Sequence, residues 1–172
     1  MNLRPNYLLG GSGFPVVYVH EMAKDIRHCA ETGMIASDFD SLTHNWAVNG
    51  LNYYVLAQLL WDPAQNVDDI IDDYCQKGFG KAAGIMKKYF LHCEKLTSKL
   101  AECRAENIRE VEDLTSRPQG FIDFFMNSFT DAEMAKLQTM LNEARRAVSA
   151  DKEALQRVEF IAVGLDITRN RV

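Results

Sequence analysis

The stretch that decides the fold is Trp46–Trp61, with the sequence WAVNGLNYYVLAQLLW. Its length suits a helix of about four turns, and apolar residues occupy every side of that helix. A helix that is apolar all round is buried rather than amphipathic, so we expect this one to pack against partners on two faces. Asp62-Pro63 follows at once and ends the helix, because the residue before a proline disfavours the helical conformation.

On the C-terminal side of this helix the pattern is purely helical. Apolar residues recur at three- and four-residue spacing, which is the period of one helix face. Residues 107–120 break this pattern because they are polar and contain a proline, and an irregular connection or a short helix is expected there. The predicted helices are Val67–Lys77, Lys81–Cys103, a short buried one in Phe121–Phe129, Thr130–Val148 and Asp151–Thr168. The last two are expected to form an antiparallel pair.

On the N-terminal side the pattern is different. The first 18 residues are rich in glycine and proline, which is typical of loops, with a short strand expected at Pro15–Val19. His20–Thr32 has one apolar face and predicts a helix, with Gly33 at its C-terminal end. Met34–Asp40 is apolar and then acidic, which predicts a strand. Loop, strand, helix and strand in this order indicate a β/α unit.

Composition limits the possibilities. The chain has 172 residues, 47% of them hydrophobic, which is enough for one domain or slightly more. A complete (β/α)8 barrel needs at least about 200 residues. The net charge is −5 and the 19 basic residues are scattered, so no basic surface for nucleic acid is expected. Neither an export signal nor an apolar run of about 18 residues is found, so we expect a soluble chain without a membrane span.

Metal and cofactor chemistry is not indicated. The acidic run within Asp68–Asp73 is interpreted as a solvated helix face, since metal sites draw ligands from more than one element. Gly10–Gly13 lacks the residues of a phosphate-binding loop. No pair of cysteines forms a CxxC motif, and small buried thiols are the favoured interpretation. The four are Cys29, Cys75, Cys93 and Cys103. We therefore expect no metal and no cofactor.

The densest polar and aromatic cluster lies between the second strand and the decisive helix. It consists of Asp38, Asp40, His44, Asn45 and Trp46. Carboxylates and an amide can bind sugar hydroxyls, an indole can stack on a sugar ring, and paired carboxylates serve glycoside hydrolysis. The alternative is structural: Asp40 and the adjacent serine cap the next helix, and Trp46 belongs to the core.

The chain also resembles a known family through its strings of residues. The motifs are Trp46-Ala47, Gly50–Tyr54, Leu59–Pro63 and the turn Phe79–Ala83. They are similar to those of a bacterial family of glycoside-hydrolase-like proteins that includes glycoside hydrolase family 163, endo-β-N-acetylglucosaminidases acting on N-glycans. The similarity covers most of the chain and is strongest from Gly33 to Leu96.

This resemblance implies a fold and a role. The fold would be mainly α: residues 1–62 would form the last β/α steps of an incomplete (β/α)8 barrel, and residues 63–172 a helical C-terminal domain. Met34–Asp40 would be the final barrel strand, with the polar cluster at the strand end where barrel active sites lie. The catalytic carboxylates would come from middle barrel strands, which this chain lacks, so we expect a fragment, a shortened reading frame or a remnant.

We therefore expect the C-terminal portion of a glycoside hydrolase, which supplies one wall of a sugar pocket and a supporting helical domain and is inactive alone. Its glycan would reach it through the parent barrel. A second copy of the chain or the missing barrel segment would cover its exposed apolar surface. The parent family is often exported, although the sequence leaves the compartment unknown. The alternative is a helical protein-interaction module without sugar chemistry.

Overall fold

A computed structural model describes residues 2–3, 13–38, 45–106 and 123–170 of the chain. Within these ranges the protein is mainly α, as the sequence predicts, with almost no sheet. The six helices of 13 residues or more are α1 (Val19–Glu31), α2 (Trp46–Trp61), α3 (Val67–Phe79), α4 (Ala83–Glu106), α7 (Asp131–Ala147) and α8 (Lys152–Arg169). A short 3-10 helix, η1 (Gly80–Ala82), joins α3 to α4.

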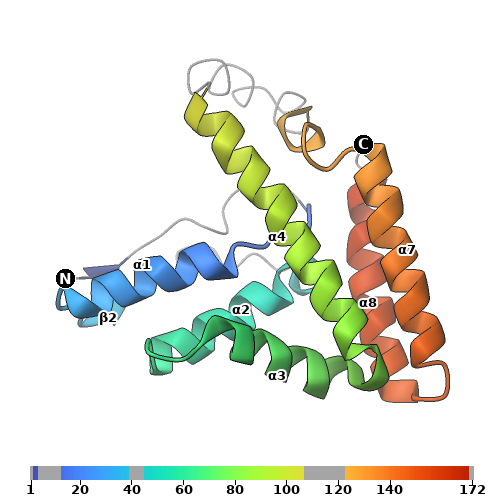
Figure 1. Cartoon of the computed structure of the whole chain (residues 1–172), viewed down its shortest axis with the longest axis horizontal. Coiled ribbons are helices and arrows are strands. Elements are labelled where there is room, and N and C mark those ends of the chain that lie inside the picture. Colours follow the sequence, from blue (N-terminus) through green and yellow to red (C-terminus); the bar gives the residue numbers. More distant parts are fainter. Residues whose placement is uncertain (1, 4–12, 39–44, 107–122, 171–172) are drawn as a thin grey trace.

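Five of these helices close around one core. Helix α3 packs on α4, α4 on α7, α7 on α8, and α8 returns to both α2 and α3, while α1 packs on α2 from the other side. Figure 1 shows α7 and α8 side by side as the expected antiparallel pair, with α4 crossing beside them. The core is a single continuous cluster of apolar side chains drawn from all six helices. No helix in the described ranges is long and apolar enough to cross a membrane.

Helix α2 confirms the prediction of a buried helix in its middle but not at its ends. It contacts α1, α3 and α8, and Leu51, Val55 and Leu59 are fully buried. The two terminal tryptophans differ: Trp46 is 56% exposed and Trp61 is 89% exposed. An even distribution of apolar residues around the helix predicts burial on average, but it does not say where the neighbouring helices stop.

The segment Gly13–Tyr18 is not the strand that we expected at Pro15–Val19. It runs through the core without strand pairing, and α1 begins at Val19. Phe14 is buried and stacks on Phe125 with ring centroids 4.8 Å apart.

Side chains of three helices bind the backbone of this segment. The Asn52 amide donates to the Val16 carbonyl at 2.8 Å and accepts from the Tyr18 N–H at 3.3 Å. Thr97 of α4 accepts from the Val17 N–H at 3.1 Å, and the Thr168 hydroxyl of α8 donates to the Gly13 carbonyl. Side-chain amides and hydroxyls thus replace the partner strand, because buried backbone groups must be hydrogen-bonded.

The strand predicted at Met34–Asp40 is much shorter than expected. Its described part contains only β2 (Ala36–Ser37), which pairs in parallel with β1 (Asn2–Leu3). The two strands are joined through α1, as in a β-α-β unit, but Ile35 is 88% exposed. Two short strands with an exposed flank do not amount to a barrel step, and the described residues show none.

Residues with known capping chemistry stand at the ends of three helices. Gly33 has φ +88° at the end of α1, a conformation that glycine adopts without strain. The Asn66 side chain accepts from the Asp68 N–H at the start of α3. Thr130 accepts from the Glu133 N–H at 3.4 Å. The Glu133 carboxylate does not reach back to the Thr130 backbone but binds His92 of α4 at 2.6 Å.

Candidate functional site

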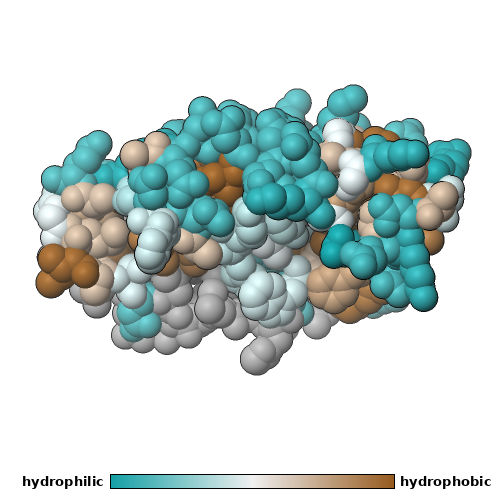
Figure 2. Space-filling view, turned by 90° about the horizontal axis from the view of Figure 1, so that it is seen from below, coloured by the Kyte–Doolittle hydropathy of each residue, from teal (hydrophilic) through white to brown (hydrophobic). Residues whose placement is uncertain are grey.

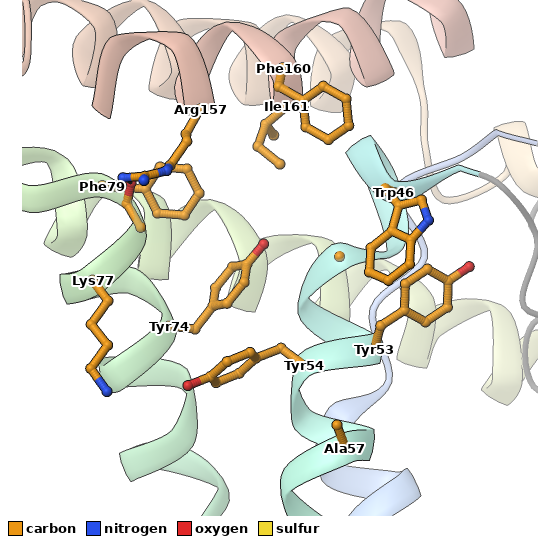
Figure 3. Close-up of a pocket in the computed structure, with 12 residues that line it drawn as sticks. Trp46, Tyr53, Tyr54, Ala57, Tyr74, Lys77, Phe79, Arg157, Phe160 and Ile161 are labelled. Atoms are coloured by element: carbon orange, nitrogen blue, oxygen red, sulfur yellow. The ribbon is translucent and has the colours of Figure 1, made fainter. Parts of the chain in front are cut away.

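The main candidate site is a cleft of about 580 Å³ between α2, α3 and α8, which we call the aromatic cleft. Six aromatic side chains, two cationic ones and several small or aliphatic residues form its walls. The lining residues are Trp46, Gly50, Tyr53, Tyr54, Ala57, Tyr74, Lys77, Gly78, Phe79, Arg157, Phe160 and Ile161. Figure 3 shows the aromatic side chains of α2 and α3 on two walls and Phe160 above them.

The aromatic rings of the cleft support one another. Trp46 meets Tyr53 edge-on, with ring centroids 4.6 Å apart. Tyr74 of α3 packs against Tyr54 at 5.2 Å and against Phe79 at 5.8 Å. Edge-on and tilted pairs at these distances are favourable aromatic contacts. The walls are therefore held in place by packing and form a concave surface before any ligand arrives.

Two lining residues, Tyr54 and Lys77, form a polar triad with Asp73 beside the cleft. The Tyr54 hydroxyl donates to Asp73 Oδ2 at 2.5 Å, and Lys77 Nζ lies 2.7 Å from the other oxygen of the same carboxylate. The hydrogen bond from Lys77, and then the one from Tyr54, hold the pKa of Asp73 below its usual value. The same carboxylate raises the pKa of Tyr54. Asp73 is thus an anion at neutral pH, and both neighbours are committed to it.

Tyr74 and Arg157 are the polar groups directed at the cleft itself. The Tyr74 ring reaches from α3 into the space between α2 and α8 (Figure 3), and within the described ranges its hydroxyl has no hydrogen-bond partner. Burial raises the pKa of Tyr74 to about 12, so the hydroxyl keeps its proton at neutral pH. Arg157 makes two long contacts, to the Gly78 carbonyl at 3.4 Å and to Glu153 at 3.3 Å.

Of the residues predicted to bind sugar, three are described by the structure: Asp38, Asn45 and Trp46. Trp46 lines the aromatic cleft. Asn45 is the exposed residue before α2, where its backbone carbonyl accepts from the N–H groups of the first helical turn. Asp38 is exposed just after β2, and its N–H donates to the Leu3 carbonyl. Asp40 and His44 lie outside the described residues.

Most of the cleft was missed at the sequence level. Tyr53, Tyr54 and Tyr74 lie in apolar helix patterns, and such patterns predict a buried helix face rather than a binding surface. Phe160 and Arg157 lie more than 100 positions after Trp46, and nothing in the local pattern of α8 links them to α2. The one available signal was a tryptophan at the start of a helix that follows a polar segment.

The acidic face of α3 and the cysteines are the other candidates for a chemical site. The described residues hold no group of three or more His, Cys, Asp or Glu arranged for a metal ion. The acidic face of α3, which was expected to be solvated, also contacts a neighbouring helix, since Asp72 pairs with Lys87 of α4 at 2.7 Å. Cys29, Cys75 and Cys93 are buried free thiols, and burial raises the pKa of Cys75 to about 12. Such thiols are poor nucleophiles.

Comparison with known families gives the class of this protein. Residues 2–91, just over half of the chain, match the model of DUF4838, a domain of unknown function. The chain therefore belongs to the DUF4838 family. The match includes α1, α2, α3 and the start of α4, and with them the two walls of the cleft that α2 and α3 provide. Neither a curated protein nor a solved structure matches this chain.

Proposed function

We propose that this chain is the carbohydrate-binding, helical C-terminal portion of a glycoside hydrolase. Residues 1–62 would be the terminal β/α segment of its catalytic barrel and residues 63–172 the supporting helical domain. The ligand would be a glycan, as for an endo-β-N-acetylglucosaminidase. The residue strings of α2 and α3 that resemble glycoside-hydrolase-like proteins support this assignment, and they lie within the part of the chain that matches DUF4838.

The observation that carries the proposal is the aromatic cleft. The negative face of an aromatic ring attracts the weakly positive C–H groups on one face of a pyranose. Trp46 is 56% exposed yet fixed by its contact with Tyr53, which suits a ring platform. Pockets of about 300 to 1,000 Å³ accommodate small ligands, so the cleft has room for one or two sugar units.

The cleft is suited to binding rather than to hydrolysis by itself. Glycoside hydrolysis ordinarily needs two carboxyl groups on either side of the scissile bond. No carboxylate is among the described side chains that line the cleft, and the nearby Asp73 is held by Tyr54 and Lys77. In this proposal the barrel of the parent enzyme supplies both catalytic carboxylates.

The two tryptophans of the chain allow a direct test, because they lie at opposite ends of α2 and only Trp46 lines the cleft. In the variant Trp61→Phe, Trp46 is the sole tryptophan, and titration with N-acetylglucosamine oligosaccharides should change the tryptophan emission. In Trp46→Phe the remaining indole should not respond. By calorimetry, Trp46→Ala should weaken binding at least about tenfold, the effect of roughly 1.4 kcal/mol, and Trp61→Ala should not.

The absence of any response to neutral or acidic oligosaccharides at millimolar concentration would contradict this proposal. So would equal responses of the two tryptophans, since Trp61 is 89% exposed and does not line the cleft.

The second candidate function is a protein-interaction module, and one observation favours it. Phe160, Val163 and Ile167 are each about half exposed on one face of α8, at the spacing of a helix stripe. The face in Figure 2 is mostly hydrophilic, with separate apolar patches rather than one broad apolar surface. Val163→Glu should abolish binding of a protein partner and leave sugar binding unchanged, which separates the two functions.

A further inference from the structure

The charges around the aromatic cleft bear on which sugar it would accept. Two charged side chains line the cleft, Lys77 and Arg157, and both are cations. No carboxylate is found among the described lining residues. The whole chain, in contrast, has a net charge of −5. Each of the two cations has a carboxylate partner outside the lining, Asp73 for Lys77 and Glu153 for Arg157.

The two cations are not equivalent. Lys77 lies 2.7 Å from Asp73, so its charge is largely balanced within the triad. Arg157 is the more available: its contacts with Gly78 and Glu153 are long, and the Glu153 side chain is 81% exposed. An exposed pair of this kind is weak, and a ligand carboxylate could replace Glu153 on the guanidinium. Arginine also offers a planar pair of donors that fits a carboxylate.

Figure 3 places Arg157 beside Phe79 on the same side of the cleft as Tyr74. The protonated Tyr74 hydroxyl has no partner within the described ranges and is a second donor. A ligand that stacks on aromatic rings while presenting an anion to a guanidinium and a phenol satisfies all three groups. A neutral sugar leaves the guanidinium without an anionic partner from the ligand.

We infer that the aromatic cleft selects a sugar ring that carries a carboxylate, such as a hexuronic acid unit, with Arg157 as the group that binds the carboxylate. This inference rests on the proposed function, because it names the class of sugar for the same cleft. Tyr74 donates a further hydrogen bond to the anionic end of the ring, and the aromatic residues contact its apolar face.

The test compares two ligands that differ only in charge: a hyaluronan tetrasaccharide, and the same tetrasaccharide with its carboxylates reduced to alcohols. By calorimetry the first should bind at least about tenfold more tightly, since a charge-assisted hydrogen bond is roughly twice as strong as a neutral one. The difference should shrink as salt is raised, because exposed charges are screened. Arg157→Gln should abolish it, and Arg157→Lys should restore part of it.

Arg169→Gln is the matched control, because Arg169 lies on the same helix but does not line the cleft. This variant should keep the full preference. Equal affinity for the two tetrasaccharides, with both lost in Trp46→Ala, would overturn the inference and leave the proposed function standing. Loss of the preference in Arg169→Gln, or its survival in Arg157→Gln, would also overturn it. Failure of both ligands and of neutral chito-oligosaccharides to bind would overturn the inference and the proposed function together.

Discussion

At the scale of single residues, Asn52 of α2 does the most to hold the segment Gly13–Tyr18 in the core. It is 1% exposed, and its amide serves the Val16 carbonyl and the Tyr18 N–H at once. Asn52→Leu should lower the free energy of unfolding by about 2 to 4 kcal/mol, because it leaves both backbone groups buried without partners. Urea titration measures this loss.

Thr97→Val is the matched comparison for Asn52→Leu. It removes one hydrogen-bond acceptor that binds the same segment, the partner of the Val17 N–H. The change in side-chain shape is small. Its cost should be about 1 kcal/mol. An Asn52→Leu protein no less stable than Thr97→Val would show that the side-chain amide does not position this segment.

At the scale of elements, α2 and α8 approach each other closely at Gly164. A Cβ atom on Gly164 would lie 2.8 Å from Ala47 Cβ and 2.9 Å from Val48 Cγ1. Gly164→Ala should therefore destabilise the protein by about 1 to 3 kcal/mol through overpacking, despite the higher helix propensity of alanine. Since α2 and α8 form two walls of the aromatic cleft, ligand binding should weaken as well.

Gly84→Ala is the control for this crossing. Gly84 lies in α4, where an added Cβ would meet nothing within 4 Å. Alanine there should raise the melting temperature, since glycine costs up to about 1 kcal/mol in a helix. Thermal melts of the two variants should move in opposite directions, and equal shifts would contradict the close approach of α2 and α8.

At the scale of the whole molecule, a hydrogen bond between α4 and α7 links stability to pH. Glu133 accepts from His92 at 2.6 Å, and this bond lowers the pKa of the glutamate below its usual value. A carboxyl group whose pKa is depressed by folding adds stability above its unfolded pKa and loses it as the pH falls through the folded value. The contribution should thus be present at pH 7 and disappear in acid, below about pH 4.

Glu133→Gln isolates this contribution. The variant should be about 1 kcal/mol less stable than the parent at pH 7, and the gap should close by pH 3, as measured by urea unfolding at each pH. Glu143→Gln, at an exposed position of the same helix α7, should show no such gap at either pH. A gap that stays constant from pH 7 to pH 3 would rule out the ionisation of Glu133 as its cause.

The helices could be predicted because they depend on local information. Apolar spacing located α1, α3, α4, α7 and α8, and Gly33 marked the end of α1 through chemistry confined to one turn. The site could not be predicted in the same way. Trp46 was selected together with Asp38 because the two are close in sequence, but only Trp46 lines the aromatic cleft. Helix α8 supplies the remaining wall, and no local pattern indicates which helices will meet.

The sequence by itself therefore determined that the protein is mainly α and that Trp46–Trp61 is buried at its centre, because hydrophobic periodicity acts within a single element. Only the tertiary structure decided that the segment Gly13–Tyr18 runs through the core without strand pairing, and that Phe160 and Arg157 complete a cleft begun by Trp46. These features arise from side chains far apart in the chain, which meet only when the helices pack and buried backbone groups must find partners.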